Sequence, residues 1–187
     1  MAGETTKSTR LTSVQAGNKK DARLQRGREY TALDTEAIAA TELEAADVTI
    51  FDIPVPSNAI ITEIAVYNDD LDSNGTPTLT LDVGLAAGED FTSITSGTAT
   101  KHSEDDVLDA DAFVDGSTTL QAATTSYTVQ AFDSTTFGPD DANKPCWEVL
   151  GYDEDPRTTF RISATFAAAA ATAAAGDLAI RVKYVLD

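Results

Sequence analysis

Hydrophobic residues alternate with polar ones along several segments of the chain, which is the period of β-strands that bury one face. The clearest segment is 78–85, where every second residue is Leu or Val and where Asp82 and Gly84 are expected to face solvent. The last segment, 177–186, places apolar side chains at alternate positions on one face. Further strands are predicted at residues 48–53, 60–67, 118–122, 126–132, 145–150 and 158–166. Roughly eight or nine strands over about 150 residues predict an all-β fold, either a two-sheet β-sandwich or a jelly roll.

The segments between these strands are less regular. Residues 35–46 could form a short helix by propensity, but a strand followed by a turn is favoured because strands follow directly. Residues 69–76 are predicted to be a turn, in which Asn74 and Gly75 are able to adopt positive φ. Residues 86–116 are predicted to be a long excursion with one short helix near 105–112.

Residues 167–175 comprise eight alanines and one threonine. A segment this short does not form a stable helix alone, because helix nucleation is costly. We therefore expect a hairpin connection between two strands, into which the strands can extend. The small side chains would allow a neighbouring surface to approach closely, although a low-complexity loop without a role is an equally good interpretation.

The first 30 residues show no sustained apolar periodicity and are predicted to be an extended N-terminal arm, followed by one β-sandwich domain over residues 31–187. The arm holds seven basic and three acidic residues, a net charge of +4, so the chain's net charge of −18 leaves −22 for the domain. The basic residues that we expect to bind a partner are Arg10, Lys19, Lys20, Arg23, Arg26 and Arg28.

The arm has three interpretations: a nucleic-acid tail, a solubility tail, or an anchor on an acidic partner surface. Its basic residues are sparse for nucleic-acid binding, which typically clusters them. The acidic domain would itself repel nucleic acid and anionic membranes. We therefore favour the anchor and expect no direct contact with nucleic acid or membrane.

The sequence offers little for catalysis. No stretch approaches the roughly 20 apolar residues that span a bilayer, and the arm lacks the apolar region of a secretory signal. The single histidine, His102, lies in a polar run at 101–106 that predicts an exposed loop, and the single cysteine, Cys146, is expected to be a small buried residue in a strand. The acidic clusters are expected to be solvated. We therefore predict that the protein is not an enzyme.

The best-formed motif is Asp70-Leu71-Asp72-Ser73-Asn74-Gly75, which reproduces the start of a calcium loop. Asp70, Asp72 and Asn74 are therefore candidate ligands of Ca²⁺ or another cation. However, the acid expected at the twelfth position of such a loop would fall on Leu81, which is apolar. The favoured alternative is a hairpin turn that uses Asn-Gly, and no other cofactor is predicted.

Lysine is scarce, with six residues against 21 aspartates. Acid-rich, lysine-poor surfaces resemble those of extreme halophiles, because at about 1 M salt the Debye length is only about 3 Å and like charges repel weakly. An ordinary acidic protein is the alternative.

Several segments resemble tailed-virus structural proteins: residues 28–30 (REY), 48–54 (VTIFDIP), 58–61 (NAII), 79–85 (LTLDVGL), 109–113 (DADAF) and 176–184 (GDLAIRVKY). Together they resemble the small β-sandwich capsid auxiliary proteins, called decoration or cement proteins, of tailed phages and archaeal tailed viruses. The acid excess and the alanine-rich segment would suit a virus of a haloarchaeal host.

The resemblance implies a virion structural protein that binds the outer surface of the major capsid protein shell and stabilises it. Its arm would lie over neighbouring subunits and its acidic domain would face solvent. The resemblance also implies a homo-oligomer, with a trimer expected at threefold positions, and residence in the host cytoplasm during assembly. The alternatives are another virion component, such as a turret, head–tail or tail protein, or a carbohydrate- or receptor-binding β-sandwich that uses Tyr67, Trp147 and Tyr152.

Overall fold

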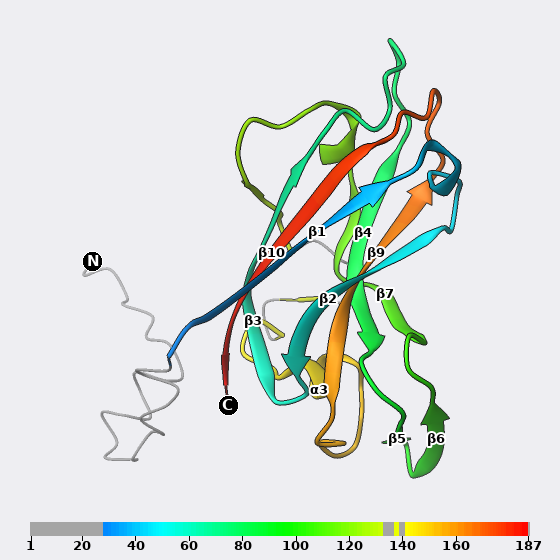
Figure 1. The fold of residues 1–187 in the computed structure, drawn as a ribbon. Coiled ribbons are helices and arrows are strands. Elements are labelled where there is room, and N and C mark those ends of the chain that lie inside the picture. Colours follow the sequence, from blue (N-terminus) through cyan, green and yellow to red (C-terminus); the bar gives the residue numbers. More distant parts are fainter. Residues whose placement is uncertain (1–27, 133–136, 139–140, 187) are drawn as a thin grey trace, which may run out of the picture.

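Two four-stranded antiparallel sheets lie in a sandwich-like arrangement (Figure 1). The computed structural model describes residues 28–132, 137–138 and 141–186. Sheet A has the strand order β1 (Tyr30–Ile38), β10 (Gly176–Leu186), β3 (Ala59–Asn68) and β8 (Thr128–Val129). Sheet B has the strand order β2 (Val48–Pro56), β9 (Thr159–Ala168), β4 (Thr80–Ala87) and β7 (Val107–Ser117). The prediction of an all-β sandwich is confirmed.

A separate two-stranded hairpin and three short helices complete the described elements. The hairpin consists of β5 (Phe91–Thr95) and β6 (Thr98–His102) and extends from one end of the sandwich (Figure 1). The helices are η1 (Ala40–Glu42), η2 (Thr119–Gln121) and α3 (Cys146–Val149). No helix within the described part of the chain is both long and apolar enough to span a bilayer.

The inner faces of the two sheets form one hydrophobic core. The largest buried side chains of sheet B are Phe51, Phe113, Phe160 and Phe166. Sheet A contributes Ile64, Val66, Leu178, Ile180 and Val182. Because fully burying one such side chain contributes about 1.5–3 kcal/mol, alternate apolar positions are enough to fix which face of each strand turns inward. The alternation predicted for residues 177–186 is therefore the inner face of β10.

The predicted strands at 60–67, 158–166 and 177–186 correspond to β3, β9 and β10. The predicted strand followed by a turn at 35–46 is also found, because β1 ends at Ile38 and the turn of η1 follows. β2 runs beyond its predicted end and passes through Pro54. Its register with β9 shifts between Phe51 and Val55, and such an irregularity accommodates a proline, which has no N–H for the ladder.

Several sequence predictions in the less regular half of the chain are wrong. The helix expected near 105–112 is not formed: residues 107–112 belong to β7, because pairing with β4 outweighs the local helix preference of alanine. The strand expected at 118–122 is η2, a single turn whose Leu120 is buried. The strand expected at 145–150 is α3, which begins directly after Pro145. The strand expected at 126–132 is shortened to the two residues of β8.

Candidate docking surface

The outer face of sheet A gathers exposed apolar side chains. Strand pairing aligns Leu33 of β1, Arg181 of β10, Ala65 of β3 and Val129 of β8 in one row across all four strands. Tyr67 lies in the next row along β3, opposite Ala179 of β10. The exposed fraction is 60% for Leu33, 59% for Val129 and 43% for Tyr67, and these are three of the five large apolar side chains exposed among the described residues. The exposed apolar surface is therefore concentrated on this face.

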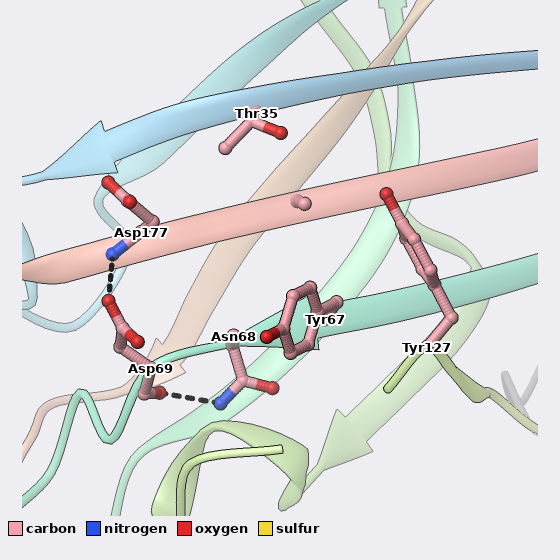
Figure 2. A pocket seen from close by; sticks show the side chains of 7 residues that line it. Thr35, Tyr67, Asn68, Asp69, Tyr127 and Asp177 are labelled. Atoms are coloured by element: carbon pink, nitrogen blue, oxygen red, sulfur yellow. Dashed lines mark hydrogen bonds between the residues drawn. The ribbon is translucent and has the colours of Figure 1, made fainter. Parts of the chain in front are cut away.

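Two tyrosines form a shallow pocket on this face (Figure 2). The ring centroids of Tyr67 and Tyr127 are 5.8 Å apart, with the planes tilted by 52°. The pocket has a volume of about 210 Å³, and Thr35, Asn68, Asp69, Asp177 and Ala179 complete its lining. Asp69 accepts a hydrogen bond from the backbone N–H of Asp177 at 2.9 Å, which fixes one end of the pocket (Figure 2).

Paired charges lie beside this pocket. The Arg181 guanidinium lies over the Tyr127 ring, 4.6 Å from its centroid, and donates to Glu63 at 3.0 Å. Lys183 donates to the second oxygen of Glu63 at 3.1 Å, and chiefly this bond lowers the pKa of the Glu63 carboxyl. Arg181 and Lys183 thus offset two of the three acids Glu63, Asp69 and Asp177, which leaves a net charge of −1. This face is close to neutral on a domain whose sequence charge is −22, which makes it the face best suited to close contact with another protein.

The arm joins the body at the edge of this sheet. Arg28 is exposed and lies over the Tyr30 ring, 5.4 Å from its centroid. Tyr30 in turn stacks on Tyr184, with ring centroids 5.4 Å apart. The other predicted partner-binding residues, Arg10, Lys19, Lys20, Arg23 and Arg26, lie outside the described residues. The role of all six stays a prediction.

The three candidate calcium ligands, Asp70, Asp72 and Asn74, differ in burial and in hydrogen bonding. The carboxylate of Asp72 is buried and accepts four backbone hydrogen bonds, from the N–H groups of Thr78, Leu79, Ala171 and Thr172 at 2.7–3.1 Å. Burial alone would raise the pKa of Asp72, but these four bonds outweigh it and hold the pKa well below its usual range. Asp70 is exposed. Asn74 accepts from Thr76 N–H and donates to the Thr172 hydroxyl at 2.8 Å.

These bonds give Asp72 a structural role that needs no cation. Among the described residues, no three His, Cys, Asp or Glu side chains are grouped so as to hold a metal ion. The calcium hypothesis stays a prediction. The expected Asn-Gly hairpin is wrong, because the loop after Asn68 connects sheet A to sheet B and neither Asn74 nor Gly75 has a positive φ.

The alanine-rich segment also connects the two sheets, from β9 in sheet B to β10 in sheet A, and is therefore not a hairpin. The expected extension of a strand into the segment is found, since β9 ends at Ala168. The expected close approach occurs within the chain: Asp72 pairs with Ala173 in a β-bridge, and Ala174 N–H donates to the Leu71 carbonyl at 3.1 Å. Small side chains permit this contact between the two connections.

The remaining candidates lie in different settings. His102 ends β6 rather than lying in a loop, stacks on Phe91 with centroids 4.7 Å apart and bonds the Ser93 hydroxyl at 2.9 Å. Tyr152 packs near the same ring of Phe91, at 6.2 Å. Trp147 lies on α3, and its carbonyl accepts a hydrogen bond from the Tyr152 N–H at 3.1 Å. Cys146 is buried as predicted, in a helix rather than a strand, and burial raises the pKa of its thiol to about 12. Of the three aromatic residues named from the sequence, Tyr67 alone lines the pocket.

Two solved structures share this fold. A chain of the cyanophage Pam1 capsid asymmetric unit has a TM-score of 0.54 and 22% identity, and a chain of the capsid of Ralstonia phage GP4 has a TM-score of 0.56 and 22% identity. Each similarity covers 86% of this chain and 86% of the other, so all three chains have nearly the same length. No protein-family model matches the sequence, and no curated protein matches it. At this level of identity the similarity shows the fold.

Proposed function

We propose that the protein is a virion structural protein, and specifically a capsid decoration protein that binds the outer surface of the major capsid shell and stabilises it. The observation that carries this proposal is the fold shared with two chains of phage capsids over 86% of each chain. The same proposal makes the protein non-enzymatic.

The outer face of sheet A is the surface proposed to meet the shell. It combines exposed Leu33, Tyr67 and Val129 with charges that nearly cancel, so its burial removes apolar area from water with little repulsion between acids. The rest of the domain, strongly acidic, would face solvent and keep the particle soluble. Many weak contacts in one shell add through multivalency, so that each subunit needs only modest affinity.

The basic arm is proposed to make a second contact with the shell, in addition to that of sheet A. It leaves the body beside β1, an edge strand of sheet A, so that the face and the arm can engage neighbouring subunits together. A homo-oligomer, a trimer at threefold positions, is proposed for the bound state. Assembly would take place in the host cytoplasm, and a haloarchaeal host is proposed from the acid excess.

Shell binding tests the proposal through substitutions on sheet A. Leu33→Asp and Val129→Asp place charges on the proposed contact face, at side chains exposed enough for the fold to tolerate them. Val107→Asp is the matched control, because Val107 is exposed on β7 of sheet B. We expect the two sheet A variants to co-sediment with undecorated capsids at least tenfold less than the wild type does, and the control to bind normally. Equal binding by all three variants would reject sheet A as the contact face.

A carbohydrate- or receptor-binding module is the second candidate, favoured by the Tyr67–Tyr127 pair beside two exposed aspartates. Aromatic rings next to carboxylates are a common way to bind sugars, with apolar ring faces stacked and hydroxyls hydrogen-bonded. If the protein is a carbohydrate-binding module, Tyr127→Ala should abolish its binding to a glycan array. The same variant should still bind capsids through the part of sheet A around Leu33.

Immunogold labelling of virions tests the remaining alternatives. Its position on the particle separates decoration of the head from a turret, head–tail or tail position.

A further inference from the structure

A second surface of different character lies on the outer face of sheet B. A depression of about 450 Å³ lies over β2 and β9 and is lined by Glu36, Val48, Ile50, Asp52, Asp105 and Arg161. Its apolar floor comes from β2, where Val48 is 40% exposed and Ile50 is partly exposed. The depression therefore offers apolar contact surrounded by charge.

Acids outnumber the single base in this depression. The Arg161 guanidinium forms ion pairs with Asp105 at 2.7 Å, Glu104 at 3.1 Å and Asp52 at 3.8 Å. Glu36 also lines the depression, so that four carboxylates lie in or beside it with a single guanidinium. Because Arg161 is shared among three carboxylates, the depression has a net negative charge. A positively charged segment of chain would neutralise that charge.

The negative charge continues across sheet B to β7. Val83 pairs with Val114, and Leu85 pairs with Asp109. Between these two pairs β7 advances by five residues while β4 advances by two, so β7 forms a bulge that lies over Gly84. On this bulge the pKa of Asp109 is raised to about 6, chiefly by burial and in addition by its side-chain hydrogen bond with Asp111 and by repulsion from that carboxylate. Burial also raises the pKa of Asp82, despite its bond from Gly116 N–H. The repulsion between these acids would be reduced by protonation or by a positively charged group from another chain.

Two buried hydroxyls lie between the depression and this bulge. Ser163 and Thr165 point to the outer side of β9, as Arg161 does, because the alternate residues of β9 belong to the core. Thr165 pairs with Val48 on one side and with Asp82 on the other. Ser163 is fully buried and Thr165 is 8% exposed, yet within the described residues neither hydroxyl has a hydrogen-bond partner. Buried polar atoms nearly always have one, so this face holds hydrogen-bonding capacity that the described chain does not use.

We infer that this depression binds residues 1–27 of the basic N-terminal arm of a second copy of this chain. Those residues carry six basic and two acidic side chains, a net charge of +4. The run Arg23-Leu24-Gln25-Arg26 places a leucine between two arginines, which matches an apolar floor between carboxylates. Fully extended, 27 residues reach about 90 Å, enough to cross a neighbouring domain.

The course of β1 favours a second copy over the arm's own body. Glu36, near the end of β1, lines the depression, and the chain runs from there back to Tyr30, beside the end of β10 (Figure 1). The stack of Arg28, Tyr30 and Tyr184 holds residues 28–30 at the other end of β1, away from the depression on the same body. An arm that binds a neighbour also brings positive charge to a domain that would otherwise repel its copies.

A charge-swap experiment with the full-length chain tests this inference. The arm variant is Lys19→Glu/Lys20→Glu/Arg23→Glu, and the depression variant is Glu36→Lys/Asp52→Lys. Sedimentation velocity over a concentration series, in about 0.1 M salt so that charges are only partly screened, measures self-association. We expect the wild type to associate, each variant alone to associate at least tenfold less, and a mixture of the two variants to associate again through the reversed pair.

Matched controls separate this effect from net charge and from misfolding. Asp70→Lys/Glu154→Lys makes the same change in charge at exposed residues outside the depression and should associate like the wild type. Val48→Ser removes apolar floor without changing charge and should weaken association several-fold, with an unchanged circular dichroism spectrum. A monomeric wild type, a depression variant that associates like the wild type, or a mixture that stays monomeric would each overturn the inference. None of these outcomes bears on the virion proposal, which shell binding tests separately.

Discussion

Replacing Asp72 with asparagine tests whether this carboxylate joins the two connections between the sheets. Oδ2 accepts the N–H groups of Thr78, Leu79 and Ala171, while Oδ1 accepts that of Thr172. Asparagine keeps one acceptor oxygen and replaces the other with an NH₂ group. In its better orientation the amide oxygen keeps the three bonds, now to a neutral acceptor, and Thr172 N–H faces a second donor.

The cost follows from these four bonds. The Thr172 N–H, which is partly buried, loses its acceptor at a cost of about 1–2 kcal/mol, and each of the other three bonds weakens by about 0.5 kcal/mol when the acceptor loses its charge. We therefore expect Asp72→Asn to lower the free energy of unfolding by about 3 kcal/mol, measured by urea denaturation with an unchanged m-value. Asp70→Asn, at an exposed position in the same loop, is the control and should change it by less than about 0.5 kcal/mol.

A loss below about 1 kcal/mol for Asp72→Asn would refute this account of the loop. A calcium titration in the same assay separates the two roles considered for Asp72. A structural carboxylate predicts that the wild type gains no stability from about 1 mM Ca²⁺, whereas the calcium hypothesis predicts a gain that Asp72→Asn removes.

The remaining predictions concern β7, the acid groups and salt. The folded-state pKa of Asp109 is raised to about 6, so stability should fall as pH rises from about 4 through 6, and Asp109→Asn should flatten this dependence and raise Tm at pH 7. Asp72 has the opposite effect, because its pKa is lowered in the folded protein. The stability that its carboxylate contributes is present above about pH 4 and is lost in acid, so Asp72→Asn should make Tm less sensitive to acid. Gly84→Ala should cost several kcal/mol or displace the bulge, since its Cβ would collide with the Asp109 carbonyl oxygen, and either effect would appear in denaturation or in hydrogen exchange of β7. A halophilic protein should show a Tm that rises steeply with salt up to molar concentrations, and a salt-independent Tm would contradict a haloarchaeal origin.

The fold could be predicted where one face of a strand is buried. Residues 60–67 and 177–186 alternate because one side of β3 and β10 belongs to the core, and that signal is local. The alternation at 78–85 predicted β4 but not the burial of Asp82 and Gly84, because the covering bulge comes from β7. Residues 105–112 and 145–150 were assigned wrongly for the same reason: their structure depends on partners distant in the sequence.

The candidate sites show the same division. The motif around Asp72 could be recognised from its spacing, but the N–H groups that Asp72 binds come partly from Ala171 and Thr172, which no local pattern links to it. Tyr67 could be named from the sequence as a contact residue. Its neighbour Tyr127 and the overlying Arg181 could not, because they come together only through the pairing of β3 with β8 and β10.

The position of the chain in a virion tests the central claim most directly. A cryo-EM reconstruction of the particle should show copies of this domain on the outer surface of the capsid, with Leu33, Tyr67 and Val129 of sheet A turned towards the shell. Absence of the chain from purified virions, or a domain that presents sheet A to solvent, would contradict the account.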